Sequence, residues 1–356
     1  MTRIFLIRHA EAEGNLYRIA QGQFDSNLTD RGWRQVRALE GRFAGVHVDA
    51  VYSSDLYRTC ATASALYRPK KLPLVRRSDL REICVGDWEQ RTWGDIFRLW
   101  PAEMEDFSLH MDRWSIPGAE TPAQVLARVR AAVEDIAREN PGKTVAVFCH
   151  GYAIRLLLAN LQGISLADTG SKTPTGDNTA VSVLEFDGDR LRVVSQNDNA
   201  HLLTPEFLAG EKVRKRANAL EPGLWFAPLD PAAHGALLTA CAGECGVSAE
   251  ALSAPAGLAL AGYLRDEPVG LLRMDGGPGR IAWAYIRPDC RKRGFGVQLV
   301  GQAVQHARNE GVDTLSAVLP AGSAARDFLL DCGFSSEDGS LYVKHIGFDP
   351  EILGEK

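Results

Sequence analysis

The sequence predicts an α/β protein with two domains, and three observations support this. The chain has 356 residues, which is more than one hydrophobic core usually serves. Apolar runs of strand length alternate with helical patterns through the first part of the chain, and a new pattern begins at Leu224. The first run, residues 4–7, is apolar at every position, as in a strand buried on both faces, and it ends in Arg8 and His9. Open α/β sheets bind their ligands at this end of their strands.

We expect residues 1–203 to form the first domain. Thr29 or Asp30 can cap a helix, and Pro101 breaks a helical pattern over residues 92–109. A hairpin turn at residues 187–189 joins the last two strands of this domain. The other predicted strands are 48–52, 72–75, 144–149, 181–186 and 191–195, and the other predicted helices begin near residue 53 and cover 122–139 and 152–161.

Five polar residues of this domain suggest phosphate chemistry. A second apolar strand ends in His150, so two strands deliver a histidine to one sheet edge. Two arginines, Arg8 and Arg58, suit a tetrahedral oxyanion because guanidinium groups bind phosphate oxygens in bidentate fashion. A neutral His9 can attack phosphorus, His150 can stabilise the transition state, and Glu82 can protonate the leaving oxygen. These cationic side chains supply the compensating charge, so we expect that no metal is required.

With these residues, positions 1–200 resemble the histidine phosphatase superfamily, in its phosphoglycerate-mutase-like branch. The resemblance rests on four motifs in the family's order: Leu6-Ile7-Arg8-His9-Ala10-Glu11 with Asn15, Ser53-Ser54-Asp55-Leu56-Tyr57-Arg58-Thr59, Leu80-Arg81-Glu82 with Gly86-Asp87-Trp88-Glu89, and His150-Gly151. It implies a three-layer α/β domain in which His9 is the phosphorylated nucleophile and Glu82 is the proton donor. By the same resemblance, the phosphate contacts are Arg8, Asn15, Arg58 and His150.

Two questions stay open for this domain. Ala10 stands where the family usually has glycine, and alanine would be strained if this position required a positive φ. Phosphatases and mutases of this branch share their catalytic residues, so these residues do not separate the two activities. The short path from residues 86–89 to the next helix resembles the broad-specificity phosphatases. We therefore expect a phosphatase that acts on a small phosphorylated metabolite, with a phosphoglycerate-type mutase as the alternative.

We expect residues 204–221 to be a linker and residues 222–356 to form the second domain. The basic run Lys212–Arg216 predicts a solvated helix within the linker. Before the longest helix of the second domain, Gly294 and Gly296 allow a close backbone approach, and the helix N-terminus offers unpaired amides to a pyrophosphate. The predicted helices of this domain cover 232–245, 297–310 and 324–332, and the predicted strands cover 256–264, 269–274, 281–286, 314–319 and 341–345.

The segment Arg291-Lys292-Arg293-Gly294-Phe295-Gly296 resembles the acetyl-CoA-binding loop of the GCN5-related N-acetyltransferases, the GNAT family. Residues 325–334 resemble the last helix of that family and its Gly-Phe turn. The resemblance covers about residues 222–348 and implies an α+β domain with a mixed central sheet. It also implies that acetyl-CoA is held by the main chain near Tyr285 and Ile286 and by Arg291, Arg293, Gly294 and Gly296.

The second domain departs from the GNAT pattern in one important position. Leu329 stands where many relatives have a tyrosine that protonates the leaving thiolate, and an asparagine often found earlier is replaced near Ser323. Tyr285 and Tyr342 are the phenols that could substitute for it. Two hypotheses therefore stand: a bifunctional enzyme with an unidentified amine acceptor, or a phosphatase whose second domain senses acetyl-CoA or docks a partner.

Composition excludes several other classes of protein. With 45% hydrophobic residues, 24% charged residues and a net charge of −5, the chain indicates neither a nucleic-acid partner nor a membrane partner. No signal peptide and no run of ~18 apolar residues is visible, and the seven scattered cysteines fit reduced thiols, so we expect a cytoplasmic protein. Cys241 and Cys245 lie four residues apart on a predicted helix, without further metal ligands nearby in the sequence.

Overall fold

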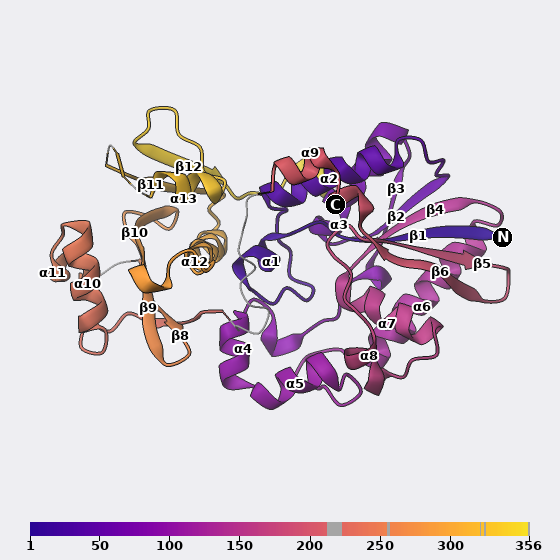
Figure 1. Cartoon of the computed structure of the whole chain (residues 1–356), viewed down its shortest axis with the longest axis horizontal. Helices are drawn as coiled ribbons and strands as arrows, with labels where there is room; N and C mark the ends of the chain where they lie inside the picture. Colours follow the sequence, from indigo (N-terminus) through magenta and orange to yellow (C-terminus); the bar gives the residue numbers. More distant parts are fainter. Residues whose placement is uncertain (212–222, 255–256, 321, 324, 355–356) are drawn as a thin grey trace.

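The computed structural model describes residues 1–211, 223–254, 257–320, 322–323 and 325–354. Within these ranges the chain forms two six-stranded sheets (Figure 1), and the predicted α/β class is confirmed. Helix α9, Pro205–Ala209, lies in the predicted linker. The basic helix predicted at Lys212–Arg216 lies outside the described residues, as do the first residues of the strand predicted at 256–264 and of the helix predicted at 324–332.

The first sheet has the strand order β3-β2-β4-β1-β5-β6. Strands β3, β2, β4 and β1 are parallel neighbours, whereas β5 is antiparallel to β1 and forms a hairpin with β6. The strands are β1 Thr2–Arg8, β2 Ala50–Ser54, β3 Leu74–Arg77, β4 Thr144–Cys149, β5 Val181–Phe186 and β6 Leu191–Asp198. This arrangement brings the ends of β1 and β4 together.

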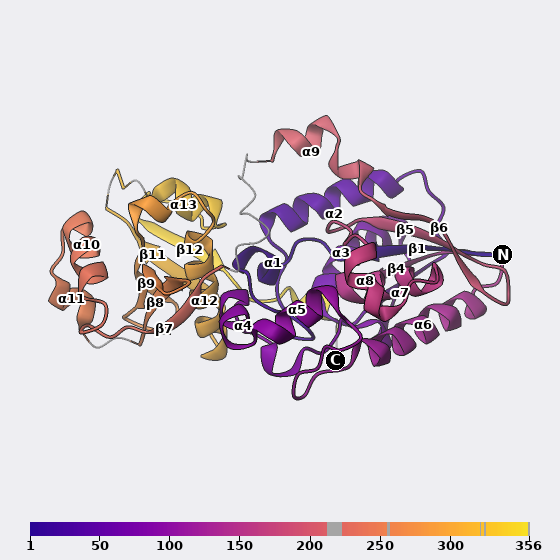
Figure 2. The same cartoon turned by 60° about the horizontal axis from the view of Figure 1, so that its bottom comes forward.

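Helices cover both faces of the first sheet, and Figure 2 shows α2 above it and α6 below it. In β1, Ile4 and Leu6 join the hydrophobic cluster under α6 and α7, whereas Ile7 joins the cluster under α2 and α3. The uninterrupted apolar run therefore reflects a strand that is covered on both faces. The four helices are α2 Asp30–Phe43, α3 Tyr57–Lys70, α6 Pro122–Glu139 and α7 Gly151–Leu161.

The second sheet has the strand order β12-β11-β10-β9-β8-β7 and is antiparallel except between β10 and β11. Helix α12 packs on one face, and α10 and α11 pack on the other. The strands are β7 Trp225–Pro228, β8 Leu258–Leu264, β9 Glu267–Met274, β10 Arg280–Ile286, β11 Thr314–Val318 and β12 Leu341–His345. The helices are α10 Gly235–Cys245, α11 Ala249–Ser253 and α12 Gly296–Asn309. This mixed sheet agrees with the predicted architecture.

The remaining elements show where sequence patterns were less informative. The break at Pro101 is confirmed, but β2 begins and ends two residues later than predicted, because Ser53 and Ser54 are fully buried and continue the strand. The other helices are α1 Glu13–Tyr17, α4 Trp93–Leu99, α5 Pro101–Leu109, α8 Leu166–Lys172, α13 Arg326–Asp331 and α14 Pro350–Leu353. The 3-10 turns are η1 Ser78–Leu80, η2 Gly86–Trp88, η3 Ala200–Leu202 and η4 Pro288–Cys290.

Helix α1 packs against α12 and so joins the two halves of the chain (Figure 1). Tyr17 of α1 belongs to the hydrophobic cluster under α12. Arg308 near the end of α12 forms an ion pair with Glu13, with 2.6 Å between Nη1 and Oε2, and the two side chains are only 14% and 6% exposed. The contact is therefore an apolar interface with a buried ion pair.

The C-terminal segment also returns to the first half after β12. The rings of Tyr57 and Phe348 contact each other with centroids 4.8 Å apart. Ile352 of α14 is 1% exposed and belongs to the hydrophobic cluster under α3. The C-terminal end of the second half thus contributes to burial in the first.

Candidate active site

The two histidines lie side by side because of the register of their strands. β1 and β4 pair from Arg3 with Thr144 to Arg8 with Cys149, and the next residue of each strand is a histidine. The ring centroids of His9 and His150 are 5.3 Å apart, and both side chains are buried. The predicted delivery of two imidazoles to one sheet edge is what the register produces.

The ring of His9 is held in a single tautomer. Its Nδ1 lies 2.7 Å from the backbone oxygen of Ala10, and because a carbonyl oxygen only accepts, Nδ1 carries the proton. Burial, followed by the charges of Arg58 and Arg8, lowers the pKa of His9 well below its ordinary value. His9 is therefore neutral at pH 7, with a lone pair on Nε2.

Two arginines flank the histidines, and each has an unpaired donor. Arg58 is 1% exposed, and its terminal nitrogens donate to the backbone oxygens of Gly22 and Phe24 at 2.7 and 2.9 Å. Arg8 donates through Nη1 to the backbone oxygen of Gly176. The Nε–H groups of both arginines and Nδ1 of His150 are buried without a hydrogen-bond partner. Because such groups are costly unless satisfied, their grouping here indicates a site for a ligand with acceptor oxygens.

Two small residues, Ala10 and Gly151, border this group of side chains. Ala10 is not among the residues with positive φ, so the strain considered for alanine at this position does not arise. Its N–H donates to Thr62 Oγ1 at 2.9 Å. At Gly151, a Cβ atom would lie 2.9 Å from Nε of Arg8, so a larger residue would displace this guanidinium group.

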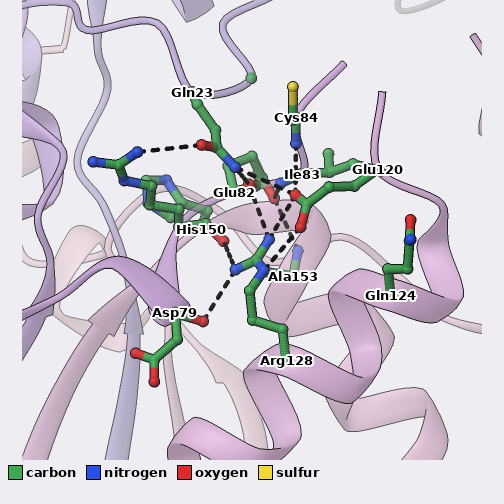
Figure 3. A network of polar contacts seen from close by, with 12 residues as sticks. Gln23, Asp79, Glu82, Ile83, Cys84, Glu120, Gln124, Arg128, His150 and Ala153 are labelled. Carbon is green, nitrogen blue, oxygen red and sulfur yellow. Dashed lines mark hydrogen bonds and ion pairs between the residues drawn. The ribbon is translucent and has the colours of Figure 1, made fainter. Parts of the chain in front are cut away.

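Glu82 lies beside the N-terminus of α7 and close to His150 (Figure 3). Its Oε1 accepts hydrogen bonds from the backbone N–H groups of Ile83 and Ala153 at 3.1 and 3.0 Å, and its Oε2 accepts one from Tyr152 at 3.1 Å. Oε1 thus uses both of its lone pairs, whereas Oε2 keeps a second lone pair at which a proton can reside. The predicted proton donor thus lies with the predicted phosphate pocket.

Asn15 has a different environment from the other predicted residues. It is half-buried in α1, and its Oδ1 accepts a hydrogen bond from the backbone N–H of Ala12 at 3.0 Å. This oxygen therefore stabilises the start of α1.

The structure adds residues that the sequence patterns missed. Ser54 ends β2 and its Oγ lies 2.9 Å from Nε2 of His150. Asn178 donates through Nδ2 to the backbone oxygen of His9 at 2.9 Å, and the N–H of Thr179 donates to the backbone oxygen of Arg8 at 3.1 Å. Ser54 could have been found from the sequence, because it lies between a predicted strand and Arg58. Asn178 and Thr179 are recognisable only once β5 is known to pair with β1.

In the second sheet, the first two residues of β10 pair with the parallel strand β11, and the rest of β10 does not. The pairs are Arg280 with Ser316 and Ile281 with Ala317. Further along β10, Tyr285 and Ile286 pair with β9, and within the described residues no strand pairs with their other edge. The main chain at these two residues therefore has backbone groups on one side that are not used by the sheet.

Arg291 is already engaged at the end of β10. Its Nε donates to the backbone oxygen of Ile286 at 2.8 Å, and it forms an ion pair with Glu244 at 2.7 Å. Its guanidinium group also lies 5.5 Å from the ring centroid of Tyr285. A pyrophosphate at this loop would have to compete with Glu244 for Arg291. Arg293 lies over Phe295 instead, with 5.0 Å between its guanidinium carbon and the ring centroid.

The two glycines of this loop have different surroundings. Gly294 has φ of +83°, and no atom lies within 4 Å of the place where its Cβ would be. A Cβ on Gly296 would lie 2.9 Å from the ring of Phe328, so this glycine allows α13 to pack closely on α12. Gly294 is therefore the one with open space beside it.

The position where relatives carry a tyrosine acid, and the two phenols that could replace it, are all buried in the second half. Leu329 is 5% exposed and packs in the hydrophobic cluster under α12. Tyr342 is 2% exposed, and its hydroxyl donates to the backbone oxygen of Gly339 at 3.5 Å. Burial raises the pKa of Tyr285 above its ordinary value. Both phenols are therefore largely shielded from solvent.

Two buried histidines with two arginines beside them, at the end of a three-layer α/β sheet, define an enzyme of phosphate chemistry. The family model of the histidine phosphatase superfamily (branch 1) matches residues 4–199, and that of the acetyltransferase (GNAT) family matches residues 224–334. The chain belongs to the histidine phosphatase superfamily, and its second half carries a GNAT domain.

Individual relatives match the first half. Phosphoserine phosphatase 1 of Hydrogenobacter thermophilus is 28% identical over 57% of this chain and 95% of its own length. A metal-independent phosphoserine phosphatase of Arabidopsis thaliana is 30% identical over 58% of this chain and 86% of its own length. Among solved structures, YhfR of Bacillus stearothermophilus is similar with a TM-score of 0.55 and 30% identity, covering 57% of this chain and all of its own.

The described part of the chain contains neither a membrane-spanning helix nor a cluster of metal ligands. No helix there is both long and apolar enough to span a bilayer. In the same residues, no three His, Cys, Asp or Glu side chains are grouped closely enough to bind a metal ion. Cys241 and Cys245 have sulfur atoms 3.9 Å apart, but no third ligand joins them there.

Proposed function

We propose that the chain is a metal-independent phosphomonoester hydrolase that acts through a phosphohistidine on His9. The observation that carries this proposal is the state of His9. Its ring is neutral, and the hydrogen bond from Nδ1 to Ala10 leaves the lone pair of Nε2 available to attack phosphorus. The unpaired donors of Arg8 and Arg58 beside it suit the non-bridging oxygens of a phosphoryl group.

The reaction then has two steps. In the first, Nε2 of His9 forms a bond to phosphorus, the bond from phosphorus to the leaving oxygen breaks, and Glu82 donates its proton to that oxygen. The hydrogen bond from Nδ1–H to Ala10 stabilises the positive charge that the phosphorylated ring carries. In the second step, water attacks phosphorus, the Glu82 carboxylate takes a proton from this water, and inorganic phosphate leaves with His9 again neutral.

Phosphoserine is the first substrate to test, because two relatives are named for it, and p-nitrophenyl phosphate is a reporter for any phosphomonoesterase. Wild type stopped in base during turnover should carry a phosphate on His9 that is stable in base and lost in acid. In His9→Ala, turnover should fall by about 10³-fold or more while the circular dichroism spectrum is unchanged. Near-normal turnover of His9→Ala would remove the covalent mechanism.

The choice between phosphatase and mutase depends on the product. Release of inorganic phosphate from a small phosphomonoester without an added bisphosphate primer is the outcome expected of a hydrolase. Isomerisation of a phosphoglycerate that depends on the primer would instead establish the mutase alternative.

For the second half, we propose that acetyl-CoA binds between the end of β10 and the start of α12. This is supported by the unpaired edge of β10 at Tyr285 and Ile286 and by the open loop at Gly294, which precedes the N-terminus of a long helix. Bound acetyl-CoA would supply an acyl group for transfer to an amine. Arg291 and Arg293 lie in this loop just before Gly294, and Arg291 must give up Glu244 to bind a phosphate.

Calorimetry of the full chain with acetyl-CoA tests binding, and the full chain is used because its C-terminal segment packs on the first half. The absence of heat and of a thermal shift would reduce this part of the proposal to a likeness of fold. If acetyl-CoA binds, a screen of amine acceptors with wild type and with Leu329→Tyr separates an acetyltransferase from an acetyl-CoA sensor. Transfer that appears only in Leu329→Tyr would support the sensor.

A further inference from the structure

The segment that carries Glu82 has little regular structure of its own. It connects η1 to η2, and residues 81–84 belong to no helix or strand. A catalytic acid must nevertheless lie within hydrogen-bond reach of the leaving oxygen, so the position of this loop must be determined by contacts from elsewhere.

Arg128 of α6 contacts this loop through both terminal nitrogens of its guanidinium group (Figure 3). Its Nη1 donates to the backbone oxygens of Asp79 and Arg81 at 3.0 and 2.9 Å, and its Nη2 donates to that of Glu82 at 3.3 Å. The side chain is 20% exposed. Three carbonyl groups within four residues of the loop are therefore bonded to a single cation.

Glu120 completes the arrangement. Its two oxygens accept from Nε and Nη2 of Arg128 at 2.9 and 2.8 Å, as a bidentate pair. Oε2 also accepts from the backbone N–H of Cys84 at 2.9 Å, and the N–H of Glu120 donates to the backbone oxygen of Cys84 at 3.0 Å. All the N–H donors of the Arg128 fork are thus used, either on the loop or on a carboxylate that also binds the loop.

The two ends of Glu82 are held by different helices. Its backbone oxygen is bound by Arg128 of α6, whereas its carboxylate is bound by backbone N–H groups at the start of α7. Helices α6 and α7 pack against each other over the same hydrophobic cluster. The position of the Glu82 carboxyl group relative to His150 therefore depends on contacts at both helices.

We infer that Arg128 and Glu120 are positioning residues for Glu82, and this inference rests on the proposed role of Glu82 as the proton donor. Neither side chain forms a hydrogen bond or an ion pair with His9 or His150, and both bind the backbone of the loop. Their function is to keep the Glu82 carboxyl group at the leaving oxygen, so their loss should slow the reaction most where protonation is most needed.

The test compares two substrates by kcat/KM, which reports the steps up to departure of the leaving group. An alkyl phosphate such as phosphoserine needs protonation of its leaving oxygen, whereas p-nitrophenyl phosphate needs little. In Arg128→Gln, kcat/KM should fall by about 10- to 100-fold for the alkyl phosphate and by less than about threefold for the aryl phosphate. In a Glu82→Gln background, Arg128→Gln should change this ratio no further, because its effect is transmitted through Glu82.

Arg130→Gln is the matched control. Arg130 lies on the same helix, is 45% exposed, and bonds to Glu134 and Asn160 rather than to the loop. Its substitution should leave both values of kcat/KM unchanged. If Arg128→Gln folds poorly, Glu120→Gln keeps the size of the side chain and should change the substrate ratio in the same direction by a smaller factor.

The outcomes separate this inference from the proposed function. Equal losses on both substrates in Arg128→Gln would overturn the positioning role and leave only a structural one, while a base-stable phosphate trapped on His9 in that variant would show that the hydrolase mechanism still stands. Absence of both turnover and trapped phosphate in wild type would overturn the proposed function and this inference together.

Discussion

At the scale of residues, the first half of the chain holds three histidines in the neutral form. Burial is the main cause that lowers the pKa of His9 and His150 well below the ordinary value, and it lowers the pKa of His201 to about 4. Arg42 donates to Nδ1 of His201, so the ring proton lies on Nε2, which is 2.9 Å from the hydroxyl of Thr179. Thr179 has φ of +64°, an unusual conformation for a β-branched residue, and its N–H supports the end of β1. Neutrality of His201 thus helps to hold the strand that carries His9.

These histidines should make stability depend on pH in a defined direction. Their folded pKa values are lowered, so the unfolded chain binds more protons below its pKa of about 6.5, and stability is present above that pH and lost as the pH falls toward the folded values. We expect His201 to contribute a slope of about 1.4 kcal/mol per pH unit between pH 6 and pH 5. Urea unfolding at pH 7, 6 and 5 measures this slope, which should decrease in His201→Gln and remain unchanged in His47→Gln, whose side chain is 81% exposed. An unchanged slope in His201→Gln would contradict the assignment.

At the scale of elements, α12 is flanked by two glycines that both have a positive φ. One lies just before its N-terminus and the other just after its C-terminus. Gly294 precedes its N-terminus with φ of +83°, and Gly311 follows its C-terminus with φ of +73°. Neither has an atom within 4 Å of the position of a Cβ. The backbone cost of a larger residue should therefore be similar at both positions, whereas only the N-terminus of the helix attracts an anion.

This pair gives a controlled test of the acetyl-CoA site. Gly294→Val should weaken acetyl-CoA binding by about tenfold or more, because a branched side chain would occupy the approach to the helix amides. Gly311→Val should cost similar stability but leave the affinity unchanged. Titration calorimetry gives the two affinities and thermal melting gives the two stabilities. Equal weakening of binding by both variants would mean that the effect comes from strain in α12.

At the scale of the whole molecule, α12 connects the two halves. Its first turn lies at the proposed acetyl-CoA loop, and its last turn carries Arg308, which pairs with Glu13 in α1. Arg308 also donates through Nε to the backbone oxygen of Ile346 at 2.9 Å, and Asn27 donates to the same oxygen at 3.0 Å. The ion pair is therefore part of a contact that includes the start of the C-terminal segment.

Loss of Arg308 should destabilise the chain, because Glu13 would lose its cationic partner in a site that is 6% exposed. We expect Arg308→Ala to lower the free energy of unfolding by about 3 kcal/mol. Arg130→Ala, which removes an exposed partner of Glu134, should lower it by less than about 0.5 kcal/mol. Urea unfolding followed by tryptophan fluorescence at pH 7 provides the comparison, and similar values for the two variants would contradict a buried role for the pair.

Local patterns in the sequence were sufficient to predict the two strands that end at His9 and His150. An apolar run with a polar residue at its end is visible within ten residues, because burial on both faces of a strand imposes composition on neighbours in the chain. The Pro101 break and the glycine loop before α12 are local in the same sense. The short helix α1 was missed, since five residues contain too few turns to show a helical period.

The remaining features depend on contacts between distant segments. Arg128 and Glu82 are 46 residues apart, and Glu13 and Arg308 are 295 apart. A hydrogen bond from a side chain to a backbone oxygen imposes no residue type at the acceptor, so Asp79, Arg81 and Glu82 show no sign in the sequence that Arg128 binds them. Likewise, burial of α1 against α12 depends on how two sheets pack, which no periodicity within either helix specifies. Tertiary structure alone therefore decided how the proton donor is held and how the two halves are joined.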